Sequence, residues 1–213
     1  MISMRMRNLI ESSLSAHGAQ MLFGDRMTKL ADAQSVYLSP NDIKALAQLG
    51  ERYVRETLRL LESCVTAAGQ ARADDVIRPV ILQGEQFFLQ PSPAIPDQAG
   101  LLGMMCNAFL ARELIAQISE RTRAMRGFPL IAAAPHPEAE VIRRIIGAEL
   151  AQQLDQIVAE CLDAPRLRFL GNSTYQLQNS LRATGRVGDW SVTLEDEISQ
   201  CSSSLGLSLT GDL

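Results

Sequence analysis

The sequence predicts an α+β fold in which amphipathic helices pack on antiparallel β-hairpins. Long segments carry apolar residues at spacings of three and four, which is typical of helices with one buried face. Between them lie short apolar segments that reverse at a glycine, which is typical of hairpins. The order predicts an α-β-α-β-α unit over residues 1–127 and a helix with an antiparallel sheet over 138–201, either separate or continuous with the first unit. A flexible tail is expected over 202–213.

The first helix and the first hairpin are predicted close to the start of the chain. The helix is expected over about residues 8–16. Residues 19–23 and 26–30 then form two short apolar segments on either side of Gly24-Asp25. A glycine beside an aspartate suits the tight turn of a β-ribbon, so this segment predicts the first hairpin.

A long helix that begins at Pro40 has the clearest start in the sequence. Ser39 is suited to the N-cap, Pro40 to the first helical position, and the charge of Asp42 to the positive helix N-terminus. Gly69 is expected to close the helix. Its predicted buried face consists of apolar residues at helical spacing: Ile43, Leu46, Ala47, Val54, Leu58, Leu61 and Val65.

A second hairpin is predicted around Gly84, where residues 80–82 and 86–89 form two short extended segments. The prolines at positions 91, 93 and 96 disfavour a helix until Asp97. Asp97 can cap a helix that runs to Arg126. This helix is apolar on several sides in its first half, which predicts that it is central or is covered by a partner.

The C-terminal part begins with a proline-rich connector at residues 128–137. A single helix is predicted from Pro137 to a point before Pro165, with acidic residues in its first turn. Three segments that alternate apolar and polar residues follow and predict antiparallel strands: residues 167–170, 174–178 and 190–195.

Composition places the chain among ordinary globular proteins, with 46% hydrophobic and 21% charged residues in 213. We expect a cytoplasmic protein without membrane insertion, because no apolar run reaches the ~20 residues that a spanning helix needs. The four cysteines are expected to be reduced, and the first three to be buried. Nucleic acid is an unlikely partner, because the net charge is −4 and only Lys29 and Lys44 are lysines.

No pattern of catalytic or metal-binding residues emerges. The two histidines, His17 and His136, lie in no ligand spacing, so we expect no metal and no cofactor. The glycines at 185–188 precede an expected strand rather than a helix, which favours a turn over a phosphate loop. The acids at 195–197 alternate between strand faces and favour a solvated strand end. We therefore expect a protein without catalytic residues, which is not an enzyme.

The best candidate for a binding site is the apolar face of the helix after Asp97. Methionines in such a face can adapt to different partner helices. The alternative is that the same side chains are core, which their helical spacing also favours. The predicted partner-binding residues are Leu101, Leu102, Met104, Met105, Phe109 and Ile115.

A family resemblance rests on three features of the first ~120 residues: the order helix, hairpin, helix, hairpin, helix; Asp25-Arg26 in the first turn; and Leu101-Leu102-Gly103-Met104 leading to Glu113-Leu114-Ile115. In these features the chain resembles the IcmS-like adaptor chaperones of bacterial type IVB (Dot/Icm) secretion. The resemblance implies a non-enzymatic adaptor whose partners are another small chaperone or a secreted effector, in a homodimer or heterodimer. The chain departs from the family by its additional unit after Phe128.

Two alternatives belong to other functional classes. A small-molecule-binding protein or enzyme would need a site assembled in space from polar residues such as Tyr175, Arg182 and Glu195. The segments 39–42 and 68–76 are also similar to the middle and third helices of histone-fold proteins, which implies association with DNA. The predicted hairpin and the scarcity of basic residues both oppose the histone-like alternative.

Overall fold

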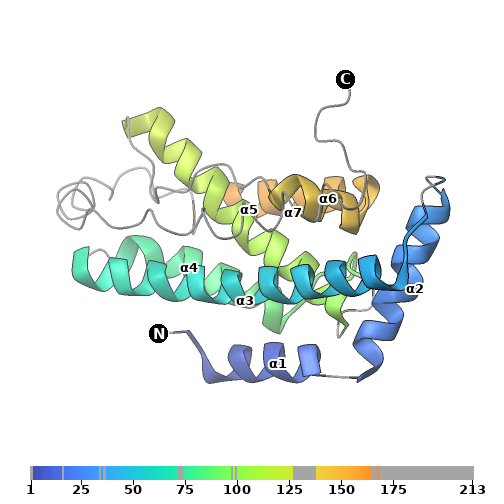
Figure 1. Cartoon of the computed structure of the whole chain (residues 1–213). Helices are drawn as coiled ribbons and strands as arrows, with labels where there is room; N and C mark the ends of the chain where they lie inside the picture. The colour runs from blue at the N-terminus through green and yellow to red at the C-terminus, as the bar shows by residue number, and fades with distance from the viewer. Residues whose placement is uncertain are drawn as a thin grey trace.

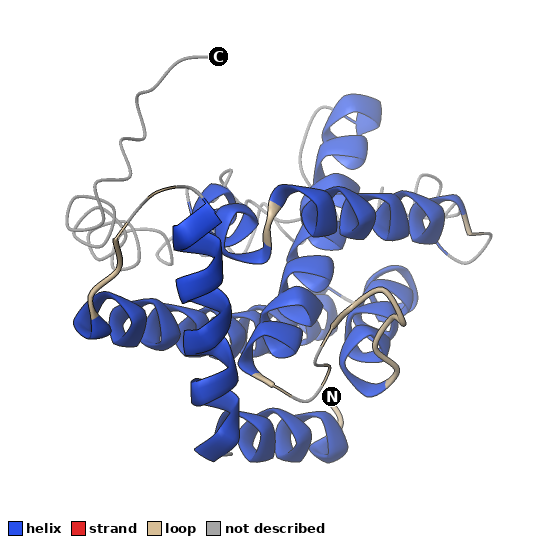
Figure 2. Cartoon of the chain, turned by 90° about the vertical axis from the view of Figure 1, so that its right-hand side faces the viewer, coloured by secondary structure: helices blue, strands red, loops and turns tan. Residues whose placement is uncertain are grey.

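The computed structural model describes residues 2–126 except 16, 34, 36, 72, 73, 97 and 99, together with residues 138–164 and 167. Within these ranges the chain forms seven α-helices and no β-strand (Figures 1 and 2). The predicted α+β class is therefore wrong, because both predicted hairpins are helical. The buried apolar side chains of all the helices described below belong to one cluster.

The first two helices are α1 (Met4–Ser15) and α2 (His17–Ala33). The predicted hairpin around Gly24-Asp25 lies inside α2. The side chains of Phe23, Met27 and Ala31 are buried at spacings of four, so the burial follows the helical period rather than the alternation of a strand. Gly24 forms no turn, and a Cβ there would lie at an ordinary contact distance of 3.4 Å from Cγ2 of Ile43 in the next helix.

The helix α3 (Pro40–Ala71) confirms the prediction for the long helix and extends two residues beyond Gly69. Asp42 Oδ2 accepts hydrogen bonds from the Ser39 backbone N–H at 2.9 Å and from the Ser39 hydroxyl at 2.7 Å. The Asp42 N–H donates in return to Ser39 Oγ at 3.3 Å. These bonds form a reciprocal cap of the helix N-terminus. Hydrogen bonding to Ser39 lowers the pKa of Asp42.

The helix α4 (Asp74–Leu89) contains the whole of the second predicted hairpin, so that prediction is wrong as well. Its buried residues follow a helical stripe: Val80, Ile81, Gly84, Glu85, Phe87 and Phe88. A Cβ at Gly84 would lie 2.9 Å from Cδ2 of Leu61 on α3. Gly84 thus permits the close contact of α3 and α4, which lie side by side in Figure 1.

The helix α5 (Leu101–Arg126) is the centre of the fold and confirms the predicted helix, with its start at Leu101. It contacts all six other helices. Figure 1 shows it crossing between the pair α3 and α4 and the pair that follows it in the chain. Its segment Leu101–Arg121 is long and apolar enough to cross a membrane, but 78% of the most apolar stretch is buried inside the fold. The segment is therefore the core helix of the described residues.

Two helices, α6 (Glu138–Ile146) and α7 (Ala148–Asp163), replace the single helix predicted after Pro137. Gly147 separates them with a φ of 95°, in the left-handed region that favours glycine. Of the predicted strands only Leu167 is described; it is buried, and its N–H donates to the Ala164 carbonyl at 3.0 Å. The rest of those strands, the predicted connector and the predicted tail lie outside the described residues, and the division into units stays a prediction.

Replacement of the two helical glycines by alanine tests the helical assignment. We expect Gly24→Ala to raise the free energy of unfolding by up to about 1 kcal/mol, because alanine is the better helix former and the nearest atom is at contact distance. Gly84→Ala is expected to lower it by about 1–2 kcal/mol, since the new Cβ overlaps the buried Leu61. Urea unfolding followed by circular dichroism measures both values. A strong loss with Gly24→Ala would instead support a turn at Gly24-Asp25.

The cap of α3 predicts a specific dependence of stability on pH. The pKa of Asp42 is lower in the folded chain than its ordinary value near 3.8. Its contribution is therefore present above that value and is lost as the pH falls through the folded pKa. We expect Asp42→Asn to reduce the thermal midpoint at about pH 6 and to reduce it less at about pH 3, below the ordinary pKa of 3.8. A reduction that is equal at both pH values would contradict the charged cap.

Candidate functional site

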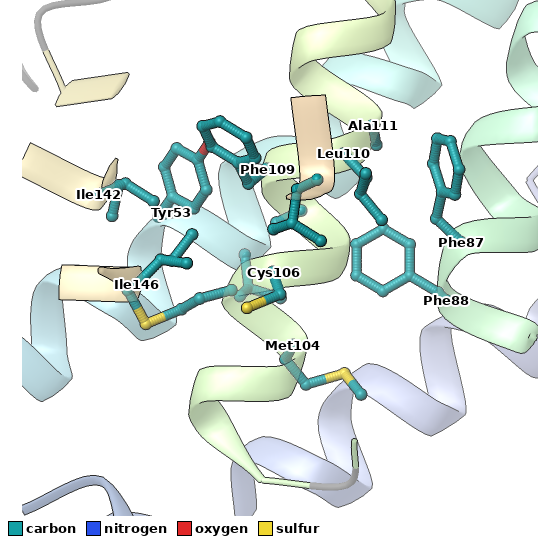
Figure 3. Packing of buried hydrophobic residues seen from close by; sticks show 14 of the residues in the cluster. Tyr53, Phe87, Phe88, Met104, Cys106, Phe109, Leu110, Ala111, Ile142 and Ile146 are labelled. Carbon is teal, nitrogen blue, oxygen red and sulfur yellow. The ribbon is translucent and has the colours of Figure 1, made fainter. Parts of the chain in front are cut away.

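The six residues predicted to bind a partner lie in the core. Leu101, Leu102, Met104, Met105, Phe109 and Ile115 are all buried. Figure 3 shows Met104, Cys106, Phe109 and Leu110 enclosed between Phe87 and Phe88 on one side and Ile142 and Ile146 on the other. The structure thus brings the predicted residues together, but as the packed centre of the bundle. These side chains are therefore core residues, and they form no exposed docking surface.

The cysteines behave as small apolar residues. Cys64, Cys106 and Cys161 are free, and the first two are buried as predicted. Burial raises the pKa of the Cys64 and Cys106 thiols to about 12, so very little thiolate is present near neutral pH.

Among the described residues no group of three or more histidine, cysteine or acidic side chains could hold a metal ion. The side chains of His17 and His136, and Tyr175, Arg182, Glu195 and Cys201, lie outside the description.

A buried polar cluster lies at the contact of α3 with α5. Arg112 is buried, and its Nε donates to Thr57 Oγ1 at 2.7 Å. Its guanidinium carbon lies 4.6 Å from the centre of the Tyr53 ring, within cation–π range. The hydroxyl of Thr57 in turn donates to the Tyr53 carbonyl at 2.8 Å. The cluster faces the core, so its role is to fix how α3 and α5 align.

A second arginine joins α6 and α7 to α5. Arg143 on α6 donates through both terminal nitrogens to Asp155 on α7, at 2.6 and 2.8 Å. The hydrogen bonds to Asp155 are the largest cause that raises the pKa of Arg143. The guanidinium lies 5.0 Å from the Phe109 ring centre and 3.9 Å from a carboxylate oxygen of Glu113. This fork therefore explains how the two C-terminal helices hold their place over α5.

Among the described residues a concave feature lies between α1, α4 and the end of α7, and we call it the α1–α4 groove. Its volume is about 830 Å³, within the range of ligand sites. The wall from α4 carries an apolar pair, Leu82 and Leu89, whose side chains are on one helix face. The residues that line it are Arg5, Arg78, Pro79, Leu82, Gln83, Glu85, Gln86, Leu89, Gln90, Ala164 and Leu167.

The floor and the rim of the groove differ in exposure. Glu85 and Leu167 are buried, whereas Arg5, Arg78, Gln86 and Gln90 are exposed and the exposed fraction of Leu82 is 47%. The Glu85 carboxylate already accepts the backbone N–H of Ser3, which attaches the start of α1 to α4. The groove is thus a half-open channel with leucine side chains between polar rims.

The two arginines of the groove carry charge that the described residues do not neutralise. Neither Arg5 nor Arg78 has a hydrogen bond or ion pair within the described part of the chain. Other arginines are paired, including Arg7 with Glu62, Arg55 with Glu11 and Arg59 with Glu56. In a chain of net charge −4, these unpaired guanidinium groups mark the groove rim as locally positive.

Sequence reasoning missed this groove because residues 80–89 were interpreted as a hairpin. A strand would place Leu82 and Leu89 on opposite faces, since their separation of seven is odd. A helix places both on one face together with Arg78. The signal was therefore present as spacings of four and seven, but it is visible only once the segment is known to be helical.

No family model, no curated protein and no solved structure matches the chain. The resemblance to the IcmS-like adaptors is tested by none of these comparisons and stays a prediction. Two of its three grounds, the helix and hairpin order and the turn that contains Asp25-Arg26, are absent from the described residues. The hairpin argument against a histone-like fold is lost for the same reason, while the scarcity of basic residues still opposes that alternative.

Thiol labelling tests the burial of the core. At about pH 8 a thiol of pKa about 12 is thiolate in only about one molecule in ten thousand, so we expect iodoacetamide to modify the half-buried Cys161 well before Cys64 and Cys106. Peptide mapping by mass spectrometry reports each cysteine separately. In denaturant all three are expected to react alike. Rapid labelling of Cys106 in the native chain would contradict the buried position of α5.

Proposed function

We propose that this protein is a non-enzymatic adaptor that binds other polypeptides, and that the α1–α4 groove is its docking surface. The observation that carries the proposal is the combination, in one concave site, of half-exposed Leu82 with Arg5 and Arg78, which have no ion pair with the described residues. A single exposed leucine on a surface needs no explanation. A leucine in a channel beside two unneutralised cations supports a partner that supplies both an apolar and an acidic surface.

The shape of the groove supports a polypeptide over a small molecule. Small-molecule sites bury roughly 70–90% of their ligand. Here most of the lining side chains are exposed or half-exposed, and only Glu85 and Leu167 are buried. A small ligand would keep much of its own surface in water, whereas a partner protein can cover Leu82 with side chains on a folded backbone.

The chemistry of the lining supports binding over catalysis at this site. The residues of the groove include no histidine, cysteine, serine, threonine, tyrosine or lysine that could act as a nucleophile or a general base. Its one carboxylate, Glu85, already accepts the Ser3 N–H. The groups that remain are amides, guanidinium groups and leucines, which suit recognition.

The expected setting of the adaptor follows from the sequence. The resemblance to type IVB secretion chaperones suggests a bacterial cytoplasmic protein whose partner is another small chaperone or a secreted effector. The groove proposal does not depend on that resemblance, because it rests on the geometry of α1, α4 and α7. A partner of another kind would satisfy it equally well.

A pair of matched leucine variants tests the docking function. Leu82→Asp places a charge in the groove, and Leu22→Asp on α2 is the control, because Leu22 is similarly exposed at 56% and lies outside the groove. Partners recovered from source-cell extract are identified and purified, and their dissociation constants are measured by calorimetry. We expect Leu82→Asp to raise the dissociation constant at least about tenfold, the cost of about 1.4 kcal/mol.

The Leu22→Asp control shows whether any loss of binding is specific to the groove. Leu22→Asp is expected to bind like the unchanged protein, and both variants are expected to keep its unfolding midpoint, since both side chains are exposed. If every purified partner binds Leu82→Asp as tightly as the unchanged chain, the groove is not the docking surface.

A further inference from the structure

We propose that the partner segment seated in the α1–α4 groove is an amphipathic helix with acidic residues beside its apolar stripe. This inference rests on the proposed docking function and adds the chemistry of the occupant. It is carried by the placement of Leu82 and Leu89 on α4 with Arg5 and Arg78 on the two walls of the groove.

The apolar side chains of the groove have the repeat of a helix. Leu82 and Leu89 are seven residues apart on α4, which is two turns and about 10.5 Å along the axis. A partner helix that lies along α4 presents its own apolar residues at the same interval, at positions i, i+3 or i+4, and i+7. The partner's apolar residues at i and i+7 can therefore meet Leu82 and Leu89 at the same time.

A helical partner needs no backbone hydrogen bonds from the groove, whereas an extended partner would need them. A strand that binds a protein normally adds to an exposed sheet edge, which supplies its hydrogen bonds. The described residues contain no sheet, and the groove is lined by side chains of helices. A helix satisfies its own N–H and C=O groups and needs only side-chain contacts.

The charge of the groove selects acidic partners. Arg5 projects from α1 and Arg78 from α4, and the remaining polar side chains of the rim are glutamines. Carboxylates on both sides of the partner's apolar stripe can each meet a guanidinium group, which forms strong charge-assisted hydrogen bonds with them. A basic helix with the same apolar residues would instead bring like charges together.

The same charges argue against a second copy of this chain as the occupant. In a two-fold dimer that buries the groove, the patch meets itself, so Arg5 and Arg78 would face the same residues of the other copy. An anionic membrane is also less suitable, because membrane-binding helices present a protruding apolar face and Leu82 lies in a channel. An acidic helix from another protein satisfies both the shape and the charge.

Synthetic peptides test the charge preference with the full-length protein. The acidic peptide is a labelled helix of about 18 residues, with leucines at i, i+3 and i+7 spacing and glutamates beside them, long enough to form a helix. The basic peptide has lysine in place of each glutamate. Fluorescence anisotropy is expected to show at least about tenfold tighter binding of the acidic peptide, since its glutamates form charge pairs with Arg5 and Arg78 and the lysines of the basic peptide repel them.

Variants of the two arginines show where the preference arises. The double change Arg5→Glu and Arg78→Glu is expected to reverse the preference, so that the basic peptide binds more tightly. Arg123→Ala is the control, because Arg123 is an exposed arginine on α5 outside the groove. It is expected to bind the acidic peptide like the unchanged protein. Circular dichroism and the unfolding midpoint verify that each variant is folded.

Each other outcome has a defined meaning. Equal binding of both peptides, lost in Leu82→Asp, overturns the acidic preference and leaves the docking function intact. Binding of neither peptide, or binding that survives Leu82→Asp, overturns the helical occupant. If all polypeptide binding, including that of the recovered partners, is also insensitive to Leu82→Asp, the docking function fails too.

Arginine-dependent binding to phosphatidylserine vesicles without peptide binding assigns the groove to a lipid surface. A dimer that Leu82→Asp dissociates, shown by light scattering, assigns it to a second copy.

Discussion

The burial of α5 is the constraint on which the rest of the fold depends. Every residue from 101 to 112 is buried, so the first half of this helix has no face in water. Each large apolar side chain that leaves water contributes about 1.5–3 kcal/mol, and a helix that is apolar all round obtains this only when it is enclosed. The pair α3 and α4 covers one side of α5, and α6 and α7 cover another. The glycines set how near the covering helices can come: a Cβ at Gly50 on α3 would lie 2.5 Å from Met105 Sδ.

Polar groups give this apolar contact a defined register. Leucine and methionine side chains alone allow neighbouring helices to slide with little cost, because such cores lose uniqueness before they lose stability. Arg112 resists sliding between α3 and α5, since its Nε must reach Thr57 while its guanidinium stays over Tyr53. Arg143 does the same for α6 and α7 through Asp155 and the Phe109 ring. Both arginines lie over aromatic rings of the core, which compensates part of the cost of removing their charge from water.

The parts of the fold that the sequence could predict are those with a local cause. The start of α3 depends on Ser39, Pro40 and Asp42, which are adjacent, and it was predicted to the residue. The error at Gly84 arises because a glycine has two uses, to reverse the chain or to admit a neighbouring helix. A short window of sequence contains Gly84 but not Leu61, which lies elsewhere in the chain and decides between the uses. At Gly24 a Cβ would fit, and the helix is instead indicated by the burial of Phe23 and Met27 at a spacing of four.

The same reasoning explains why the candidate site could not be located from the sequence. Whether the α5 face is core or interface depends on α6 and α7, which follow it in the chain and cover it through apolar contacts and through Arg143. Once α5 is enclosed, the groove takes its exposed apolar side chain from α4, whose two sides differ. Phe87 and Phe88 turn to the core, whereas Leu82 remains half in water. Because the Ser3–Glu85 bond and the buried Ile2 and Met6 hold α1 beside α4, the side of α4 that does not face the core becomes the wall of a channel. The groove is thus a consequence of how α1 is anchored, and loosening that anchor would open the channel and expose Ile2 and Met6 of the core.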